Sequence, residues 1–240
     1  MKTKSFTMGL VAAAMMASVP MGASAQDKVE ASVGADLVSG YIWRGQDLGG
    51  VSIQPSVSVA YKGFSLGAWG SVGLDKEDTK EFDLTLGYGI GGFSVSVTDY
   101  WFTGGEGYFM YDSHRTAHVF EAQVGYDFGP VAVNWYTNFA GADYCKYDGD
   151  RAYSSFISVA APFKLGGIDW TAEIGATPWE TSFYNATDEY PGSNGFTVCD
   201  VALSASKEIK ITDSFSVPAF AKVSVNPRTQ QTHFVFGLSF

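Results

Sequence analysis

The feature that most constrains the fold is a regular alternation of tight turns and longer loops between segments of alternating polarity. In each segment apolar side chains occupy every second position, which is the period of a β-strand with one apolar face. We count twelve such segments. Tight turns are expected at 62–63, 91–92, 129–130, 166–167 and 212–213, and longer loops at 45–50, 75–80, 103–116, 141–150, 178–195 and 226–230. An even strand number, with short turns at one end and long loops at the other, predicts one antiparallel up-and-down β-barrel.

A soluble β-sandwich is the alternative, but it has no reason to keep every tight turn at one end. The mean hydropathy of +0.02 fits either fold, since lipid-facing and lumen-facing residues of a membrane barrel average out. The pattern therefore predicts an all-β transmembrane barrel of about twelve strands, with short periplasmic turns and longer extracellular loops.

The amino-terminal residues resemble an export signal. Two lysines precede an apolar run at 8–19, and a small-residue cleavage site ends at Ala25. A membrane anchor helix is the alternative, but it needs about 20 apolar residues. We predict that residues 1–25 are a cleaved signal peptide and that 26–240 form the barrel, in the outer membrane of a Gram-negative cell.

The last strand ends the chain on an aromatic residue. Phe234, Phe236, Leu238 and Phe240 fall on one side of this strand, as expected for a face that meets lipid. The ending resembles the terminal strand of bacterial outer-membrane barrels, whose final Phe is read by the barrel-assembly machinery. This resemblance implies that Phe240 is an assembly signal, and that outer-membrane lipid and this machinery are partners.

The first strand is expected to be long. Its apolar face runs from Val29 through Leu37 and continues to Tyr41 and Trp43. This pattern places both aromatic rings on the outer face and Arg44 on the inner one.

Several short blocks between about residues 30 and 102 resemble one protein family. The blocks are Tyr41-Ile42-Trp43-Arg44-Gly45-Gln46, Pro55, Gly63-Phe64, Ala68-Trp69-Gly70-Ser71, Glu81-Phe82-Asp83 and Gly87-Tyr88. They resemble the TorF-like porin family, first catalogued as conserved hypothetical proteins under the Gcw name. The resemblance implies an outer-membrane barrel with a pore, and it brings no catalytic residues.

Charged residues on the polar faces of the strands are expected to line the lumen. Acids outnumber bases there. The acids are Glu30, Asp36, Glu81, Asp83, Glu121, Asp127, Asp169, Glu173 and Asp200, and the bases are Arg44 and Lys222. Carboxylates in a narrow lumen attract cations. The sequence thus predicts a passive, cation-preferring channel for small hydrophilic solutes, narrowed by inward Trp69, Tyr100, Tyr136 and Phe220.

A closed barrel with a structural or surface-interaction role is the alternative. In that case the carboxylates only pair with the two bases and with hydroxyl groups in a filled interior. A barrel enzyme is a third possibility, raised by Asp112-Ser113-His114 in a long loop. Consecutive residues do not usually give the nucleophile–base geometry that catalysis needs, so we predict no enzyme and no catalytic residue.

Cofactor, metal and nucleic-acid partners are not expected. The net charge of −10 argues against nucleic acid, which requires a basic face. Asp143, Asp148 and Asp150 carry oxygens that suit Ca²⁺, but they lack the full spacing of a calcium loop, so a solvated loop is preferred.

The two cysteines, Cys145 and Cys199, both fall on the long-loop side of the predicted topology. Export permits a disulfide. We expect a bridge that fixes the fourth outer loop across the barrel mouth; the alternative is two separate thiols.

Overall fold

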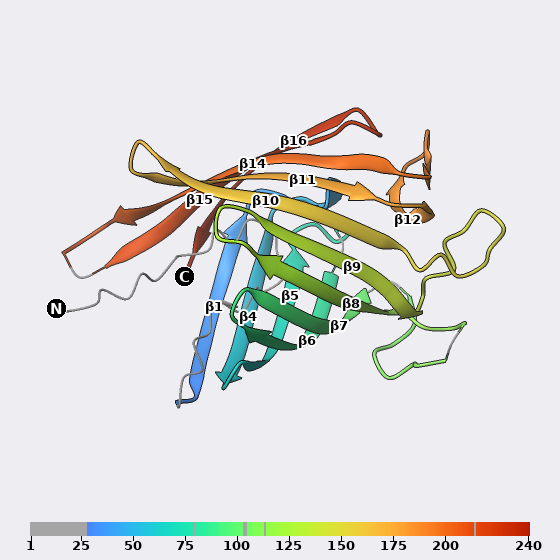
Figure 1. The fold of residues 1–240 in the computed structure, drawn as a ribbon, viewed down its shortest axis with the longest axis horizontal. Helices are drawn as coiled ribbons and strands as arrows, with labels where there is room; N and C mark the ends of the chain where they lie inside the picture. The colour runs from blue at the N-terminus through green and yellow to red at the C-terminus, as the bar shows by residue number, and fades with distance from the viewer. Residues whose placement is uncertain (1–27, 79, 103–104, 113, 214) are drawn as a thin grey trace.

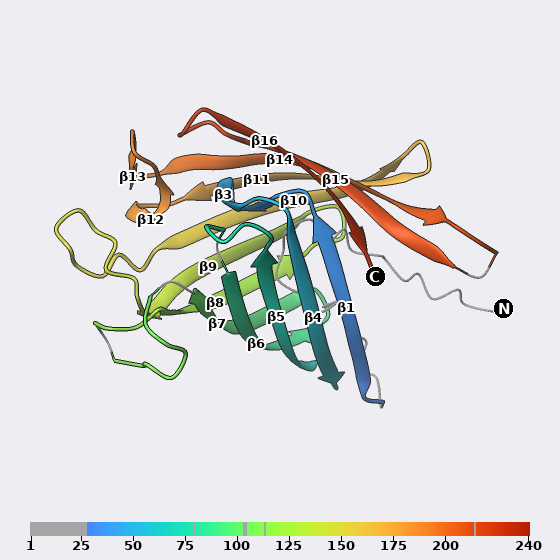
Figure 2. The same cartoon turned by 180° about the vertical axis from the view of Figure 1, so that it is seen from behind.

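The computed structural model describes residues 28–240, except 79, 103–104, 113 and 214, so the predicted signal peptide lies outside the described residues. Within this part of the chain twelve strands form one closed antiparallel barrel (Figures 1 and 2). The prediction of an all-β, twelve-stranded barrel is confirmed. No helix in the described residues is long and apolar enough to cross a membrane.

The barrel strands follow one another around the wall in chain order. They are β1 (Glu30–Val38), β4 (Ser52–Tyr61), β5 (Phe64–Gly73), β6 (Lys80–Ile90), β7 (Phe93–Phe102), β8 (His118–Asp127), β9 (Ala132–Gly141), β10 (Ser155–Leu165), β11 (Ile168–Thr177), β14 (Thr197–Lys210), β15 (Ser216–Asn226) and β16 (Gln231–Ser239). Four further strands, described below, form two small hairpins at one end.

Tight turns connect the strands at what we call the short-turn end. At the first of these turns Lys62 and Gly63 have φ values of 50° and 86°, and at the fourth Gly166 and Gly167 have 63° and 73°. Two consecutive left-handed residues give a turn whose twist matches that of the paired strands. All longer connections lie at the opposite end, the long-loop end (Figure 1).

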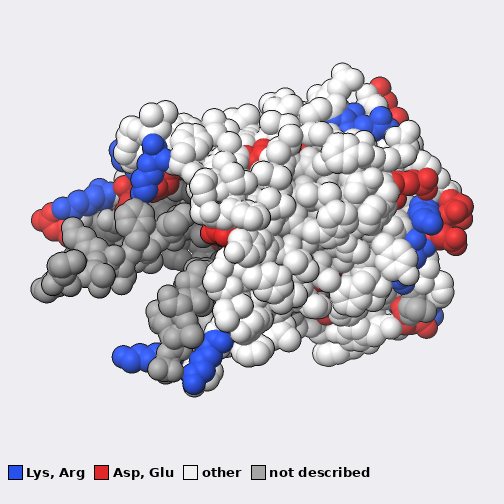
Figure 3. Space-filling view, in the orientation of Figure 1, with Lys and Arg blue, Asp and Glu red and all other residues white. Residues whose placement is uncertain are grey.

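The two faces of the strands differ in polarity as the alternation predicts. Val33, Leu86 and Phe236 point outward and are 85%, 59% and 60% exposed, whereas Ser94 and Ser96 point inward and are buried. In Figure 3 the charged side chains gather mainly at the two ends of the barrel, and a broad band between them is largely free of charge.

The last strand closes the barrel against the first. β1 and β16 pair at Asp36–Val38, and the backbones of Ala35 and Phe240 exchange two hydrogen bonds of 3.1 and 2.9 Å. The Phe240 side chain is exposed on the outer face.

The structure corrects the expected length of the first strand. β1 ends at Val38, and the chain then turns inward as a separate hairpin of β2 (Tyr41–Trp43) and β3 (Gln46–Gly49). Tyr41 and Trp43 are therefore buried inside the barrel and do not face outward. The break occurs at Ser39-Gly40, where the Ser39 backbone donates a hydrogen bond to the Phe236 carbonyl and β1 pairing stops.

A second hairpin lies in the connection expected at 178–195. It consists of β12 (Glu180–Ala186) and β13 (Pro191–Asn194), paired with each other and not with the barrel wall. Both hairpins lie at the long-loop end and pack against each other, with Trp43 of β2 against Phe183 and Tyr184 of β12.

Candidate functional site

The β2–β3 hairpin crosses the lumen, and its turn is the part that reaches farthest. Arg44 and Gly45 form this turn with φ values of 51° and 77°. A Cβ atom on Gly45 would overlap the carbonyl oxygen of Cys199 in β14. The side-chain amide of Asn226 in β15 also donates to the Gly45 carbonyl at 3.0 Å. The backbone of the turn is therefore seated directly on β14 and β15.

The Arg44 side chain reaches the other side of the barrel, at β8. Its Nη1 and Nη2 donate to the two carboxylate oxygens of Glu121 at 2.5 and 2.9 Å, and Nη1 also donates to the Tyr184 hydroxyl. Both side chains of this pair are more than nine-tenths buried. Since β9, β10 and β11 separate β8 from β14 in the wall, the turn bridges distant parts of the barrel.

Aromatic rings surround the guanidinium of Arg44. Its Cζ lies 4.0 Å from the ring centroid of Tyr136 and 4.4 Å from that of Trp43. Such cation–π contacts are strongest where water is excluded. A bidentate ion pair inside an aromatic cage fixes the position of the turn, because moving it would leave two buried charges unpaired.

The hairpin strand β2 packs against the opposite wall. The Tyr41 hydroxyl donates to Oε2 of Glu81 at 2.8 Å, and its ring lies 5.6 Å from that of Trp69. The Trp43 ring contacts Tyr100 in β7 and Tyr184 in β12, both at 5.8 Å. One buried cluster results, consisting of Tyr41, Trp43, Trp69, Tyr100, Val119, Phe156, Tyr184 and Cys199. This cluster packs inside the lumen at the level of the hairpin.

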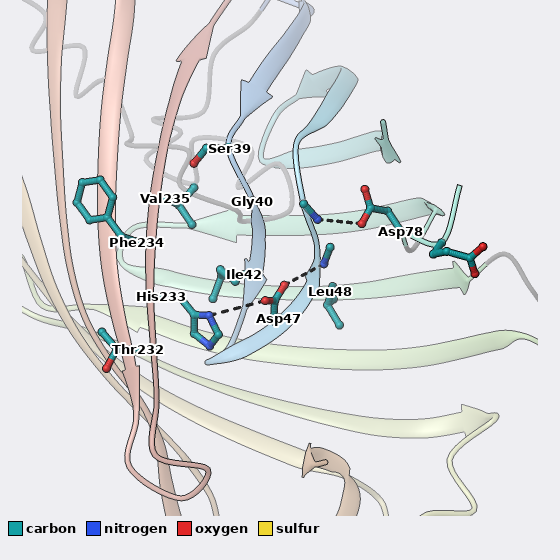
Figure 4. A pocket seen from close by; sticks show the side chains of 13 residues that line it. Ser39, Gly40, Ile42, Asp47, Leu48, Asp78, Thr232, His233, Phe234 and Val235 are labelled. Carbon is teal, nitrogen blue, oxygen red and sulfur yellow. Dashed lines mark hydrogen bonds and ion pairs between the residues drawn. The ribbon is translucent and has the colours of Figure 1, made fainter. Parts of the chain in front are cut away.

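A cavity of about 690 Å³ lies on the other side of the hairpin, against β16. Figure 4 shows Asp47 and His233 pointing toward each other across it, with Nδ1 of His233 3.9 Å from Oδ2 of Asp47. Asp78 accepts a hydrogen bond from the Gly50 backbone at 3.0 Å at the rim. The cavity lies where β1 has left the wall, beside the part of β16 toward Gln231 that pairs with β15 but not with β1.

The structure brings together several predicted lumen residues around the hairpin. Arg44, Glu81, Asp83 and Glu121 are all buried there. A second buried group joins β14 to β15: Nζ of Lys222 lies 3.7 Å from Oδ2 of Asp200, whose Oδ1 accepts from the Ser224 hydroxyl at 2.6 Å.

Three other predicted lumen residues lie apart from both groups, toward the short-turn end. Glu30 is exposed, and Asp127 accepts a hydrogen bond from the Gly129 backbone of its own turn. Asp169 forms a 2.7 Å ion pair with Lys164, with both side chains about half exposed. Two more are half-buried and lie farther from that end: Asp36 near the end of β1, and Glu173 on β11, which interacts electrostatically with Lys222 and Asp200 of the second group. Charge inside the barrel is thus concentrated around the hairpin.

The predicted disulfide is not formed, because both thiols are free. The Cys145 carbonyl accepts hydrogen bonds from the backbone and hydroxyl of Ser182 in β12. Cys199 is fully buried in the aromatic cluster and interacts with Asn185, farther along β12. The two cysteines contact different parts of this strand, so their sulfur atoms do not meet.

The loop that carries residues 112–114 folds onto the outer face of the barrel. Nδ1 of His118 lies 2.7 Å from Asp99 and its Nε2 lies 2.6 Å from the Tyr108 carbonyl. Asp112 accepts a hydrogen bond from the backbone of His114. Ser113, part of the motif weighed as catalytic, lies outside the described residues.

Sequence reasoning missed the inward hairpin and, with it, the roles of Tyr41, Trp43, Tyr184 and Asn226. A local signal existed for the first two. Ser39-Gly40 interrupts the alternation, and Arg44-Gly45 suits a two-residue turn with left-handed backbone. No comparable signal marks Tyr184 or Asn226, whose partners are distant in sequence.

The chain matches one family model and is similar to a solved structure. A family model described as "Bacterial protein of unknown function (Gcw_chp)" matches residues 22–238. A solved structure named "KdgM porin" is similar with a TM-score of 0.45 and 9% identity, over 89% of this chain and 98% of that chain. No curated protein matches the chain.

Proposed function

The chain belongs to the Gcw_chp family of bacterial proteins, and we propose that it is a porin-like barrel of the outer membrane. The uncharged outer band between two charged ends supports this location (Figure 3). In this proposal residues 1–25 are removed on export, the outward side chains contact lipid, and the barrel-assembly machinery recognises the strand that ends at Phe240.

We further propose passive conduction of small hydrophilic solutes with a preference for cations. One observation carries this: the interior holds more carboxylates than bases. Arg44 and Lys222 are buried, together with Glu81, Asp83, Glu121 and Asp200. A negatively charged passage raises the local concentration of cations and repels anions.

The β2–β3 hairpin is the constriction of this channel. It crosses the lumen from Glu81 on β6 to Asn226 on β15, so any solute must pass beside it or displace it. While the turn is seated on β14 and β15, only ions and small solutes can pass. Conductance therefore depends on whether the turn is seated.

The same hairpin favours a second candidate, a closed barrel with a structural or surface role. Breaking the buried, bidentate Arg44–Glu121 ion pair costs much free energy. A hairpin held permanently in this position would block the passage of solutes.

Planar-bilayer recordings of the refolded chain from residue 26 onward test the two candidates. The channel proposal expects small discrete currents and a cation-selective reversal potential in a salt gradient. Silence in the native chain, and also in a variant whose turn cannot seat, supports the closed barrel. An anion-selective potential contradicts the role of the interior carboxylates.

A further inference from the structure

The buried charges around the hairpin are not balanced. Arg44 engages both oxygens of Glu121, so this pair is neutral as a unit. Glu81 and Asp83, on the adjoining part of the wall, have no such partner: no Lys or Arg in the described residues forms an ion pair with either. Two neighbouring carboxyl groups therefore remain inside the barrel without a compensating charge.

Asp83 is the more isolated of the two. It is 1% exposed, and no hydrogen-bond donor among the described residues reaches either of its carboxylate oxygens. It lies between Trp69 on β5 and Tyr100 on β7 in the strand register, and both of these rings are buried. A buried carboxylate without a partner is strongly unfavourable, so such an orphan points to an ion or proton at the site.

Glu81 lies beside it on the same face of β6, because residues two apart in a strand point the same way. The two carboxyl groups are close enough to share a proton if one of them is protonated. Glu81 also accepts the Tyr41 hydroxyl at 2.8 Å, and Ser71 lies directly opposite it on β5. The immediate surroundings are thus rich in oxygen atoms.

We infer that Glu81 and Asp83 bind one divalent cation of the Ca²⁺ class inside the lumen. Two carboxylates match its charge, whereas a single shared proton leaves one negative charge buried. All the available donors are oxygens, which hard cations prefer. Within the described residues no group of three or more His, Cys, Asp or Glu forms a metal site, so hydroxyls and water complete the coordination. Such a site is weak and exchangeable.

This cation site also touches the constriction. Tyr41 belongs to the hairpin and shares Glu81 with the cation, so occupancy of the site and seating of β2 depend on each other. The link to permeation rests on the proposed channel function, but cation binding itself does not.

Terbium luminescence tests the site directly. Tb³⁺ replaces Ca²⁺ at oxygen sites, and neighbouring Trp69 and Tyr100 can sensitise its emission when the refolded barrel is excited in the ultraviolet. The native barrel is expected to give sensitised emission that Ca²⁺ displaces. Asp83→Asn and Glu81→Gln should each weaken Tb³⁺ binding by about tenfold or more, because each removes one carboxylate ligand.

Asp169→Asn is the matched control, since it removes a carboxylate from the short-turn end where Lys164 already pairs with it. It should leave Tb³⁺ affinity unchanged. Heat-modifiable migration of each variant shows whether it has folded, and the two separate ligand variants keep the test valid if one of them does not fold.

The outcomes separate this inference from the channel proposal. Cation-selective current without Tb³⁺ emission between pH 5 and 8 overturns the inference and favours a shared proton, while the channel stands. Tb³⁺ binding that Asp83→Asn and Glu81→Gln abolish, in a barrel that passes no current, supports the site and contradicts the channel. Emission that survives both substitutions also overturns the inference.

Discussion

The two ends of the barrel interior are built from the same strands but are filled differently. At the long-loop end a hairpin, an aromatic cluster and a bidentate ion pair are buried together. Toward the short-turn end the charged residues Glu30, Asp127 and Asp169 remain exposed or bind neighbours within their own turns. Strand pairing therefore builds the wall at both ends, whereas within the described residues the buried hydrophobic clusters lie around the hairpin at the long-loop end.

This difference indicates where substitutions should change stability and conductance most. A change at the short-turn end alters a local turn or a solvated pair. A change around the hairpin alters contacts between strands that are not neighbours in the wall, and with them the path through the barrel.

The largest effect is expected from Gly45→Ala. The new Cβ would overlap the Cys199 carbonyl, so the turn cannot seat. Unit conductance should rise on the order of a few-fold, because it depends on the open cross-section. Gly91→Ala is the control: Gly91 has a similar φ of 60°, but its Cβ would meet nothing within 4 Å at the short-turn end. Equal conductance in the two variants would show that the hairpin is not the constriction.

Arg44→Ala is expected to have the second-largest effect, a loss of stability. It leaves the buried Glu121 carboxylate without a compensating charge, a change that usually lowers the free energy of unfolding by about 3–5 kcal/mol. Lys164→Ala breaks the exposed pair with Asp169 and should lower it by only ~0–1 kcal/mol. Urea unfolding in detergent measures both. Similar losses for the two variants would contradict the contrast between the ends.

Tyr41→Phe removes one hydroxyl from the hairpin and keeps its ring. The lost hydrogen bond to the Glu81 carboxylate should lower the free energy of unfolding by about 1.5–3 kcal/mol. The same urea series measures this effect. A neutral result would mean that the Tyr41 ring alone holds β2 in place.

The smallest effect concerns thiol reactivity at the long-loop end. Burial of Cys145, with Asp143 nearby, raises the pKa of its thiol to about 11. The thiolate is the reactive form, so alkylation should be slow at pH 8 and rise by about tenfold per pH unit until it levels off near the pKa. Iodoacetamide labelling with mass spectrometry follows Cys145, with buried Cys199 as the protected comparison in the same molecule. Fast labelling of Cys145 at pH 8 would contradict a raised thiol pKa.

Burial of Asp143, at the long-loop end, differs from what the sequence predicts. Its loop was predicted to be solvated, yet Asp143 is fully buried and accepts hydrogen bonds from the Ser154 backbone and the Asn138 amide. Burial raises the pKa of its carboxyl group. Nothing in the local spacing of acids distinguishes this residue from exposed Asp148.

The sequence by itself determined the wall. Strand positions, the even count, the tight turns and the closure by the last strand all depend on local alternation and turn chemistry, which a single sequence displays. For the same reason the inward orientation of Glu81, Asp83 and Glu121 could be predicted, since it needs only the period of a strand.

Only the tertiary structure decided what fills the wall. The apolar alternation continues through Tyr41 and Trp43 and predicts a longer first strand. Instead, these residues form the separate strand β2, and Arg44-Gly45 form the turn that follows it. The inward position of the hairpin is stabilised by distant residues. Its turn forms hydrogen bonds with Glu121, Tyr184 and Asn226 and packs against the Cys199 carbonyl. The residues that form hydrogen bonds with the turn lie between 77 and 181 positions away in the chain. A contact of that kind has no local pattern, because it exists only once the barrel has brought β8, β14 and β15 around one lumen.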